Sequence, residues 1–146
     1  MTTTLATWTC DTCGETIDGP EQGIVAWGHS PADEFAVDRF VIVHRLSVRP
    51  SCDPDGNTSS MELAHMVGDQ GFAILLSFLS VGPIRGGGGQ KITNFDNYVD
   101  TVRRLQVPGY EQARSKFGSQ EVADEFGDAT EYSPYLPETL EKIIRL

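Results

Sequence analysis

The chain has 146 residues, of which 39% are hydrophobic and 22% are charged, and it carries a net charge of -10 at pH 7. This length is typical of one domain and allows burial of roughly two thirds of the surface that the unfolded chain exposes. Acidic residues dominate residues 1–80, where 11 Asp and Glu stand against 3 Lys and Arg. Such a surface repels phosphate groups, so direct binding of nucleic acid is disfavoured.

Membrane insertion and secretion are also disfavoured. The first seven residues lack the basic start and apolar core of a signal peptide. The longest apolar run, residues 72–81, is about half of the roughly 20 residues that a membrane helix requires. Three cysteines cannot all pair within one chain, and in a reducing compartment a Cys-x-x-Cys pair favours metal binding over a structural disulfide. We therefore expect a cytoplasmic protein with no membrane segment.

The N-terminal part is expected to be rich in β-structure. Residues 7–45 combine aromatic and β-branched residues with Gly and Pro turn formers, which predicts short antiparallel strands. The strongest of these strands is Arg39–Arg45, and it places His44 near its end. A turn-rich, irregular stretch at 46–59 follows and contains Cys52.

The second half is expected to be helical. A first helix begins near Ser59, because Ser59 and Glu62 have the spacing of a capping box. The run 72–81 predicts a second helix that is apolar nearly all round and therefore buried in the core. Asn94 caps a third helix that extends to about Gln106. The apolar face of this third helix comprises Phe95, Tyr98, Val99, Val102 and Leu105.

Further helices follow towards the C-terminus. Pro108 starts one that Gly118 ends, a weaker segment lies at 121–126, and Pro137 opens a terminal helix. Its apolar stripe comprises Leu140, Ile143, Ile144 and Leu146. The glycine run 86–89 predicts a flexible linker or exposed loop; a phosphate-binding loop is less favoured because Gly-Lys-Ser/Thr is missing.

The motif Cys10-Asp11-Thr12-Cys13-Gly14 predicts half of a zinc site. Two thiolates in this spacing can bind one zinc ion, because the tight turn between them aims both sulfur atoms at a common point. Glycine after the second cysteine relieves backbone crowding in that turn.

A structural zinc site needs two more ligands, and the chain offers Cys52 together with one of its three histidines. We choose His44, because it ends a strand and is followed by a short turn-rich segment that leads to Cys52. His65 is the next candidate, and His29 also stays open. The predicted ligands of the structural zinc ion are Cys10, Cys13, His44 and Cys52.

The segment Trp8–Ile17 resembles the first knuckle of zinc-ribbon-type proteins. Together with Val41–His44 and Cys52, it is similar to small, largely uncharacterised bacterial proteins that pair such a knuckle with a later His and Cys. The resemblance covers the first third of the chain, which lacks the second Cys-x-x-Cys of a usual ribbon. It implies a zinc-binding module and no particular activity.

The sequence supports a catalytic role of the same residues less well than it supports a structural zinc site. A redox Cys-x-x-Cys pair usually lies where a strand meets a helix in a βαβ unit, whereas this one lies in a turn-rich β region. A thiol of Cys10 or Cys52 activated by His44 would lack a third, orienting group. Three thiolates and one imidazole would close the coordination of a metal and leave no position for water. We therefore assign no catalytic residue.

One cluster of basic and aromatic residues is a candidate for partner binding, because Arg and Tyr are favoured anchors in interfaces. The alternative is that the arginines pair with acidic groups of the chain while the tyrosine packs in the core. The cluster comprises Arg103, Arg104, Tyr110 and Arg114. Phe126, Tyr132 and Tyr135 could line a neighbouring groove.

These features predict an α+β fold, in which a β-rich zinc-ribbon-like module, residues 1–58, packs on a helical part, residues 59–146. The expected function is that of a non-enzymatic interaction or adaptor protein, stabilised by zinc and bound to a protein partner. Two alternatives stay open: a small enzyme or small-molecule binder that uses a cleft between the two parts, and an acidic regulator of nucleic-acid machinery.

Overall fold

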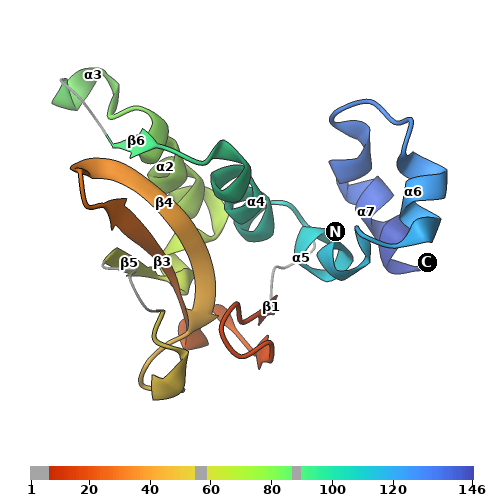
Figure 1. The fold of residues 1–146 in the computed structure, drawn as a ribbon, viewed down its shortest axis with the longest axis horizontal. Helices are drawn as coiled ribbons and strands as arrows, with labels where there is room; N and C mark the ends of the chain where they lie inside the picture. The colour runs from red at the N-terminus through yellow and green to blue at the C-terminus, as the bar shows by residue number, and fades with distance from the viewer. Residues whose placement is uncertain (1–6, 55–58, 87–89) are drawn as a thin grey trace. The chain divides into compact units, whose positions relative to one another are not determined.

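The computed structural model describes residues 7–54, 59–86 and 90–146. These residues form a mixed α+β fold with seven α-helices and two β-sheets. The chain divides into two compact units, Ala6–Gln106 and Val107–Leu146 (Figure 1). The boundary predicted at residue 58 lies inside the first of these units.

The first unit contains both sheets. A two-stranded hairpin comes first, and a four-stranded sheet follows with the strand order β5-β3-β4-β6. Strands β3, β4 and β5 pair antiparallel, whereas β6 runs parallel to β4 and makes the sheet mixed. The strands are β1 (Trp8–Thr9), β2 (Thr16–Ile17), β3 (Gly23–Ser30), β4 (Asp33–His44), β5 (Ser59–Glu62) and β6 (Lys91–Ile92).

Strand β4 is twelve residues long and ends at His44, so the predicted strand at residues 39–45 is confirmed as its C-terminal half. A bulge interrupts its pairing with β3, because two residues of β4 lie opposite Trp27 where one would fit a regular ladder. Arg39 in this bulge has a left-handed φ of 56°. Its guanidinium lies where a side chain on Gly28 would otherwise be, so a residue larger than glycine would require the Arg39 side chain to move.

The helix predicted to begin near Ser59 is wrong at its start. Residues Ser59–Glu62 form strand β5, which pairs with β3, and helix α1 (Leu63–Met66) begins only after them. A capping box satisfies two backbone N–H groups, whereas pairing with the edge of β3 engages the whole segment. Tertiary pairing therefore overrides the local signal here.

The prediction of a fully buried helix at 72–81 is wrong, because helix α2 (Gly68–Leu79) is buried on one face only. It buries Gly71, Leu75 and Phe78, which recur at the spacing of one helical face. The apolar side chains of the adjacent face remain about half exposed, because only one side of α2 faces the sheet. They are Phe72, Leu76 and Leu79, with exposed fractions of 50%, 49% and 51%.

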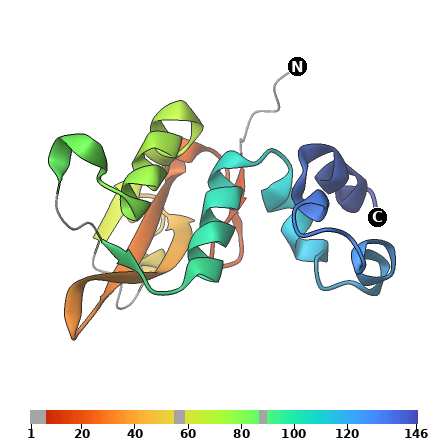
Figure 2. The same ribbon diagram turned by 90° about the horizontal axis from the view of Figure 1, so that it is seen from above.

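Helices α2 and α4 (Phe95–Gln106) lie side by side over one face of the four-stranded sheet, as Figure 1 and Figure 2 show. Four aromatic rings fill the space between these layers, with centroids 5.1–6.0 Å apart along their contacts. The rings belong to Trp27, Phe40, Phe78 and Tyr98. The hydroxyl of Tyr98 donates to the carbonyl of Leu75, and burial raises the pKa of Tyr98 to about 12.

Helix α4 confirms the predicted span and its Asn94 cap, whose side chain accepts a hydrogen bond of 3.0 Å from the backbone N–H of Asn97. The predicted apolar face is partly wrong, because Phe95 is 61% exposed. Polar anchors set the rotation of the helix: the Asn97 side chain bonds both the backbone N–H and the carbonyl of Phe40, at 2.7 and 3.1 Å. The buried face therefore comprises Tyr98, Thr101, Arg104 and Leu105.

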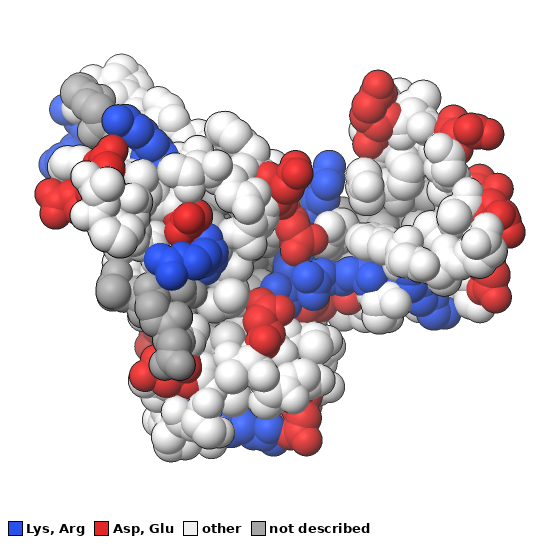
Figure 3. All heavy atoms as spheres, viewed as in Figure 1, with Lys and Arg blue, Asp and Glu red and all other residues white. Residues whose placement is uncertain are grey.

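The second unit is helical and has its own core, in which Tyr110 and Ala113 pack with Leu140 and Ile143. Gly109 adopts a left-handed φ of 86°, so the helix predicted between Pro108 and Gly118 begins only at Tyr110. It is also shorter than predicted, because α-helix ends at Ala113 and a 3-10 helix, Arg114–Lys116, follows. Many Asp and Glu side chains lie on the surface of this unit (Figure 3). Its helices are α5 (Tyr110–Ala113), α6 (Gln120–Phe126) and α7 (Pro137–Ile144).

Residues Gly82–Arg85, directly before the glycine run, form the short helix α3. Parts of the predicted N-terminal segment, the turn-rich stretch and the glycine run lie outside the described residues, at 1–6, 55–58 and 87–89. Among the helices of the described ranges, none has both the length and the apolar character needed to cross a bilayer.

Helix α2 offers a matched pair of neighbouring leucines that tests its orientation. Replacing Leu75, which is 2% exposed, by Ala should lower the free energy of unfolding by about 2–5 kcal/mol, because the change leaves a cavity in the core. Replacing the half-exposed Leu76 by Ala should change it by only about 0.5 kcal/mol. Urea unfolding measures both values, and equal losses would contradict the orientation of the helix described above.

Candidate metal centre

The first two predicted ligands lie in the turn of the β1–β2 hairpin. The backbone N–H of Gly14 donates to the carbonyl of Cys10, and the N–H of Cys10 donates to the carbonyl of Glu15, both at 2.9 Å. Gly14 has a left-handed φ of 77°, which a side chain would strain. The turn thereby holds Cys10 and Cys13 close together, as the motif predicts.

The other two ligands lie at the end of β4 and in the segment that follows it. His44 is the last residue of β4, and Cys52 closes a short 3-10 helix, Pro50–Cys52. The hydroxyl of Thr12 donates to the carbonyl of Cys52 at 3.2 Å, which joins this helix to the hairpin turn. Both segments therefore meet beside the two cysteines of the hairpin.

All four predicted ligand residues converge. The Cys13 Sγ lies 3.5 Å from His44 Nδ1, and the Cys52 Sγ lies 3.8 Å from the same nitrogen. For a tetrahedral zinc ion with ordinary bond lengths, the distance between a sulfur and a nitrogen ligand is about 3.6 Å. One ligand atom from each residue lies within 4.8 Å of all the others, so Cys10, Cys13, His44 and Cys52 are close enough to hold a metal ion.

The imidazole of His44 is already turned for metal binding. Its Nε2 lies 3.0 Å from the carbonyl of Thr16, and since a carbonyl only accepts, Nε2 donates and Nδ1 is left to face the thiols. A second hydrogen bond of this kind is usual for histidine ligands of metals, because it fixes the tautomer and the ring orientation.

The two alternative histidines lie elsewhere. Both ring nitrogens of His29 are engaged at 2.7 Å, by the carbonyl of Glu34 and the hydroxyl of Ser59. His65 is exposed and lies 3.7 Å from the carboxylate of Glu62. The cluster that could hold a metal includes His44 and neither of these.

The pKa values of two thiols in the cluster are shifted in opposite directions from the ordinary value of a cysteine. The backbone N–H of Glu15 stabilises the Cys13 thiolate and lowers its pKa to about 7, and the guanidinium of Arg49, 3.3 Å from the sulfur, acts in the same direction. Burial raises the pKa of Cys52 to about 11, and the neighbouring Cys13 thiol adds to this increase. A bound cation would reverse the second effect, since it stabilises every thiolate around it.

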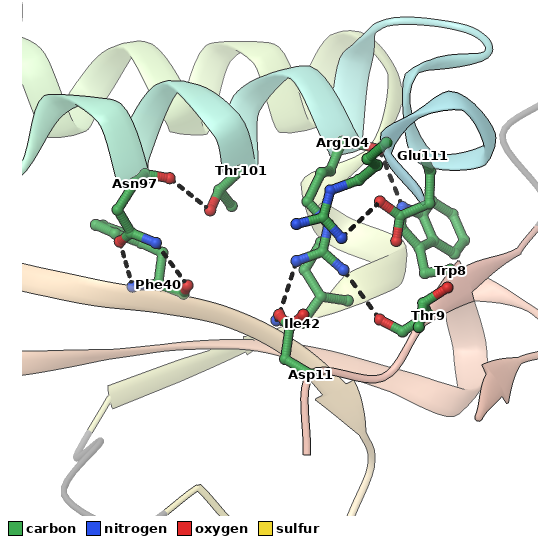
Figure 4. A network of polar contacts seen from close by, with 10 residues as sticks. Trp8, Thr9, Asp11, Phe40, Ile42, Asn97, Thr101, Arg104 and Glu111 are labelled. Carbon is green, nitrogen blue, oxygen red and sulfur yellow. Dashed lines mark hydrogen bonds and ion pairs between the residues drawn. The ribbon is translucent and has the colours of Figure 1, made fainter. Parts of the chain in front are cut away.

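Asp11, between the two cysteines, fastens the hairpin turn to the rest of the unit (Figure 4). Its backbone N–H donates to the carbonyl of Ile42 at 2.9 Å, and its carboxylate accepts from the N–H of Ile42 at 2.7 Å. The same carboxylate oxygen pairs with Arg104 Nη1 at 2.7 Å. Asp11 therefore joins the turn both to β4 and to helix α4.

Arg104 completes this network. Its Nη2 donates to the carbonyl of Thr9 at 2.9 Å, and its own carbonyl accepts from the indole N–H of Trp8 at 3.0 Å. The side chain of Arg104 is 2% exposed, so its charge is buried and balanced by Asp11. The sequence singled out Arg104 for partner binding, whereas the structure places its guanidinium in these intramolecular contacts.

The other residues of the predicted partner-binding cluster differ in their exposure. Tyr110 is 4% exposed and its ring lies 5.3 Å from that of Phe117, which places it in the core of the second unit. Arg103 and Arg114 are partly exposed, and Arg114 lies 3.7 Å from the carboxylate of Glu111. Partner binding by this cluster stays a prediction.

Sequence reasoning missed the roles of Asp11, Thr16 and Arg49. Asp11 lies inside the motif, yet only its pairing with Arg104, far along the chain, reveals its role. The contribution of Thr16 comes from its carbonyl and is independent of its side chain. No sequence pattern indicated these contacts, or the contact of Arg49 with the sulfur of Cys13.

In comparisons with known proteins, no protein-family model matches this chain, and neither a curated protein nor a solved structure matches it.

The Asp11 anchor leads to a test of stability. Replacing Asp11 by Ala should lower the free energy of unfolding by about 2–4 kcal/mol, because the charge of Arg104 would stay buried without its carboxylate. Replacing the exposed Asp18, directly after the hairpin, by Ala removes the same charge and should cost only about 0.5 kcal/mol. Urea unfolding of the two variants checks this difference, and similar losses would show that the buried pair does not stabilise the fold.

Proposed function

We propose that this chain is a zinc-stabilised, non-enzymatic protein-interaction protein, in which a zinc-ribbon-like hairpin is fixed to the end of β4 by the metal. The observation that carries the proposal is the convergence of Cys10, Cys13, His44 and Cys52 on one point. The three free cysteines also fit a reducing compartment, so we propose a cytoplasmic location.

The donor set supports zinc as the metal. Three thiolates and one imidazole form a recognised structural zinc set, and soft sulfur ligands disfavour magnesium and calcium. All four coordination positions would be filled by protein, which leaves none for a water molecule or a substrate. Zinc in this site therefore stabilises the fold and has no direct part in catalysis.

Metal binding can be tested by comparing the three histidines. Replacing His44 by Asn should weaken zinc affinity by more than the roughly 10- to 100-fold that changes around a ligand cause. The same replacement at His29 or His65 should leave affinity unchanged, because those rings face other groups. Competition with a chromophoric chelator measures affinity, and absorption of the cobalt-substituted protein reports thiolate ligation.

Protein purified without chelator should contain about one zinc ion per chain. A stably folded, metal-free preparation with no affinity for zinc or cobalt would contradict the proposed metal site. Equal affinities of the three histidine variants would contradict the assignment of His44.

The exposed face of α2 supports the interaction role. Phe72, Leu76 and Leu79 recur at helical spacing and remain about half exposed, forming an apolar row on the solvent side of the helix. Clustered apolar surface of this kind marks interaction sites more often than isolated exposed residues do. The row lies on a helix packed against the sheet, so it is presented on a rigid support.

The interaction role can be tested with two glutamate variants of α2. In the zinc-loaded protein, Leu76→Glu should weaken partner capture or self-association about tenfold or more, since charge in an apolar contact is costly. Ser77→Glu adds the same charge to the next residue, which lies outside the row, and should have little effect.

Quantitative capture from the native cell, with analytical ultracentrifugation for self-association, measures both variants. The role is contradicted if wild-type protein neither recovers a stoichiometric partner nor self-associates, or if the two variants behave alike.

A further inference from the structure

The second unit contains an apolar cleft between α6 and α7, separate from the residues that could hold a metal. Its volume is about 250 Å³, and side chains of both helices and of the segments around them line it. They include Phe117, Val122, Ala123, Phe126, Tyr135 and Ile143. Two of these, Phe126 and Tyr135, are aromatic residues that the sequence suggested as the lining of a groove.

Incomplete packing of α6 leaves this cleft open. The helix has seven residues, and none of them is fully buried. Its N-terminus is capped by Ser119, whose hydroxyl accepts from the backbone N–H of Val122 at 3.3 Å. Val122 and Phe126 pack only partly against the core of Tyr110, Ala113, Leu140 and Ile143. A fixed helix thus presents apolar side chains that the unit itself does not cover.

The size of the cleft limits its occupant. Sites for drug-sized molecules are usually about 300–1,000 Å³, somewhat larger than this one. A cavity of about 150 Å³ is enough to hold a benzene ring. The cleft therefore fits one aromatic or branched aliphatic side chain, with room for part of a neighbour, better than it fits a whole metabolite.

The charge of the surrounding chain limits the occupant further. The second unit, residues 107–146, contains eight Asp and Glu and four Lys and Arg. Three of the carboxylates, Glu121, Asp124 and Glu125, lie on α6 and are exposed. A negative field of this kind attracts cationic segments and repels a second copy of this acidic unit.

We infer that this cleft binds a basic peptide segment of a partner protein, which inserts one Phe or Leu side chain while flanking Lys or Arg residues lie near the carboxylates. The inference rests on the proposed interaction function and names the chemistry of a partner. It uses the second unit alone, whereas the α2 row belongs to the first.

The test uses zinc-loaded, full-length protein and a synthetic peptide in which one Phe is flanked on each side by three lysines. Binding should produce NMR shift changes centred on the methyl groups of Val122, Ala123 and Ile143. Affinity should fall several-fold between 150 and 500 mM salt, because opposite charges attract less at high ionic strength. Peptides with Ser in place of Phe, or with Glu in place of every Lys, should not bind.

A substitution at the rim provides the matched control. Ala123 lines the cleft and is exposed, so Ala123→Trp can fill the cleft without disturbing the core and should weaken binding at least tenfold. Ala123→Leu, a smaller change that is easier for the fold to accept, should weaken it less. Ala129→Trp places the same ring on an exposed residue outside the lining and should leave binding unchanged.

Several outcomes would overturn the inference: no binding of the lysine–phenylalanine peptide, equal binding to Ala123→Trp and Ala129→Trp, or shift changes centred elsewhere. Binding of toluene in the cleft with no binding of the peptide would also overturn it and indicate a small-molecule site. Loss of peptide binding, with capture through α2 intact, would reject this inference and leave the proposed function standing.

Discussion

The carboxylate of Asp11 is the contact on which the arrangement of the first unit depends. It lies between two predicted metal ligands and binds the backbone N–H of Ile42 and the guanidinium of Arg104 at the same time. Hairpin, sheet and helix α4 therefore meet at one side chain. A buried arginine is tolerated there because Asp11 balances its charge and the carbonyl of Thr9 accepts a further hydrogen bond from its guanidinium.

This anchor also prepares the metal centre. The four candidate ligands come from the β1–β2 turn and, more than 30 residues further along the chain, from the end of β4 and the helix at Pro50–Cys52. Because Asp11 pairs the turn with β4 two residues before His44, the thiols and the imidazole already face one another. A metal bound there would join the same segments a second time, and less ordering would be needed on binding because the ligands are held in place.

The sequence predicted those features of the fold that depend on local chemistry. The Cys-x-x-Cys-Gly turn, the strand that ends at His44, the Asn94 cap and the Pro137 helix start all follow from residue type and spacing. The convergence of the ligands could be predicted as well, because few Cys and His residues were available. The helix start predicted at Ser59 was wrong, because a local motif does not reveal that this segment pairs with β3 as a strand. The rotation of α4 was likewise missed, since polar contacts with Phe40 and Asp11 determine it.

Helix α2, which the sequence predicted to be fully buried, shows where an interaction surface can occur in this chain. A long apolar run suggests a buried helix, but a two-layer unit can cover only one side of α2, and Leu75 and Phe78 already fill that side. The first unit is held by its aromatic core and by the Asp11 and Arg104 pair, so Leu76 is not needed for the core. Exposed apolar side chains at such positions lower solubility and add nothing to the core. Contact with a binding partner is therefore the role that we propose for them.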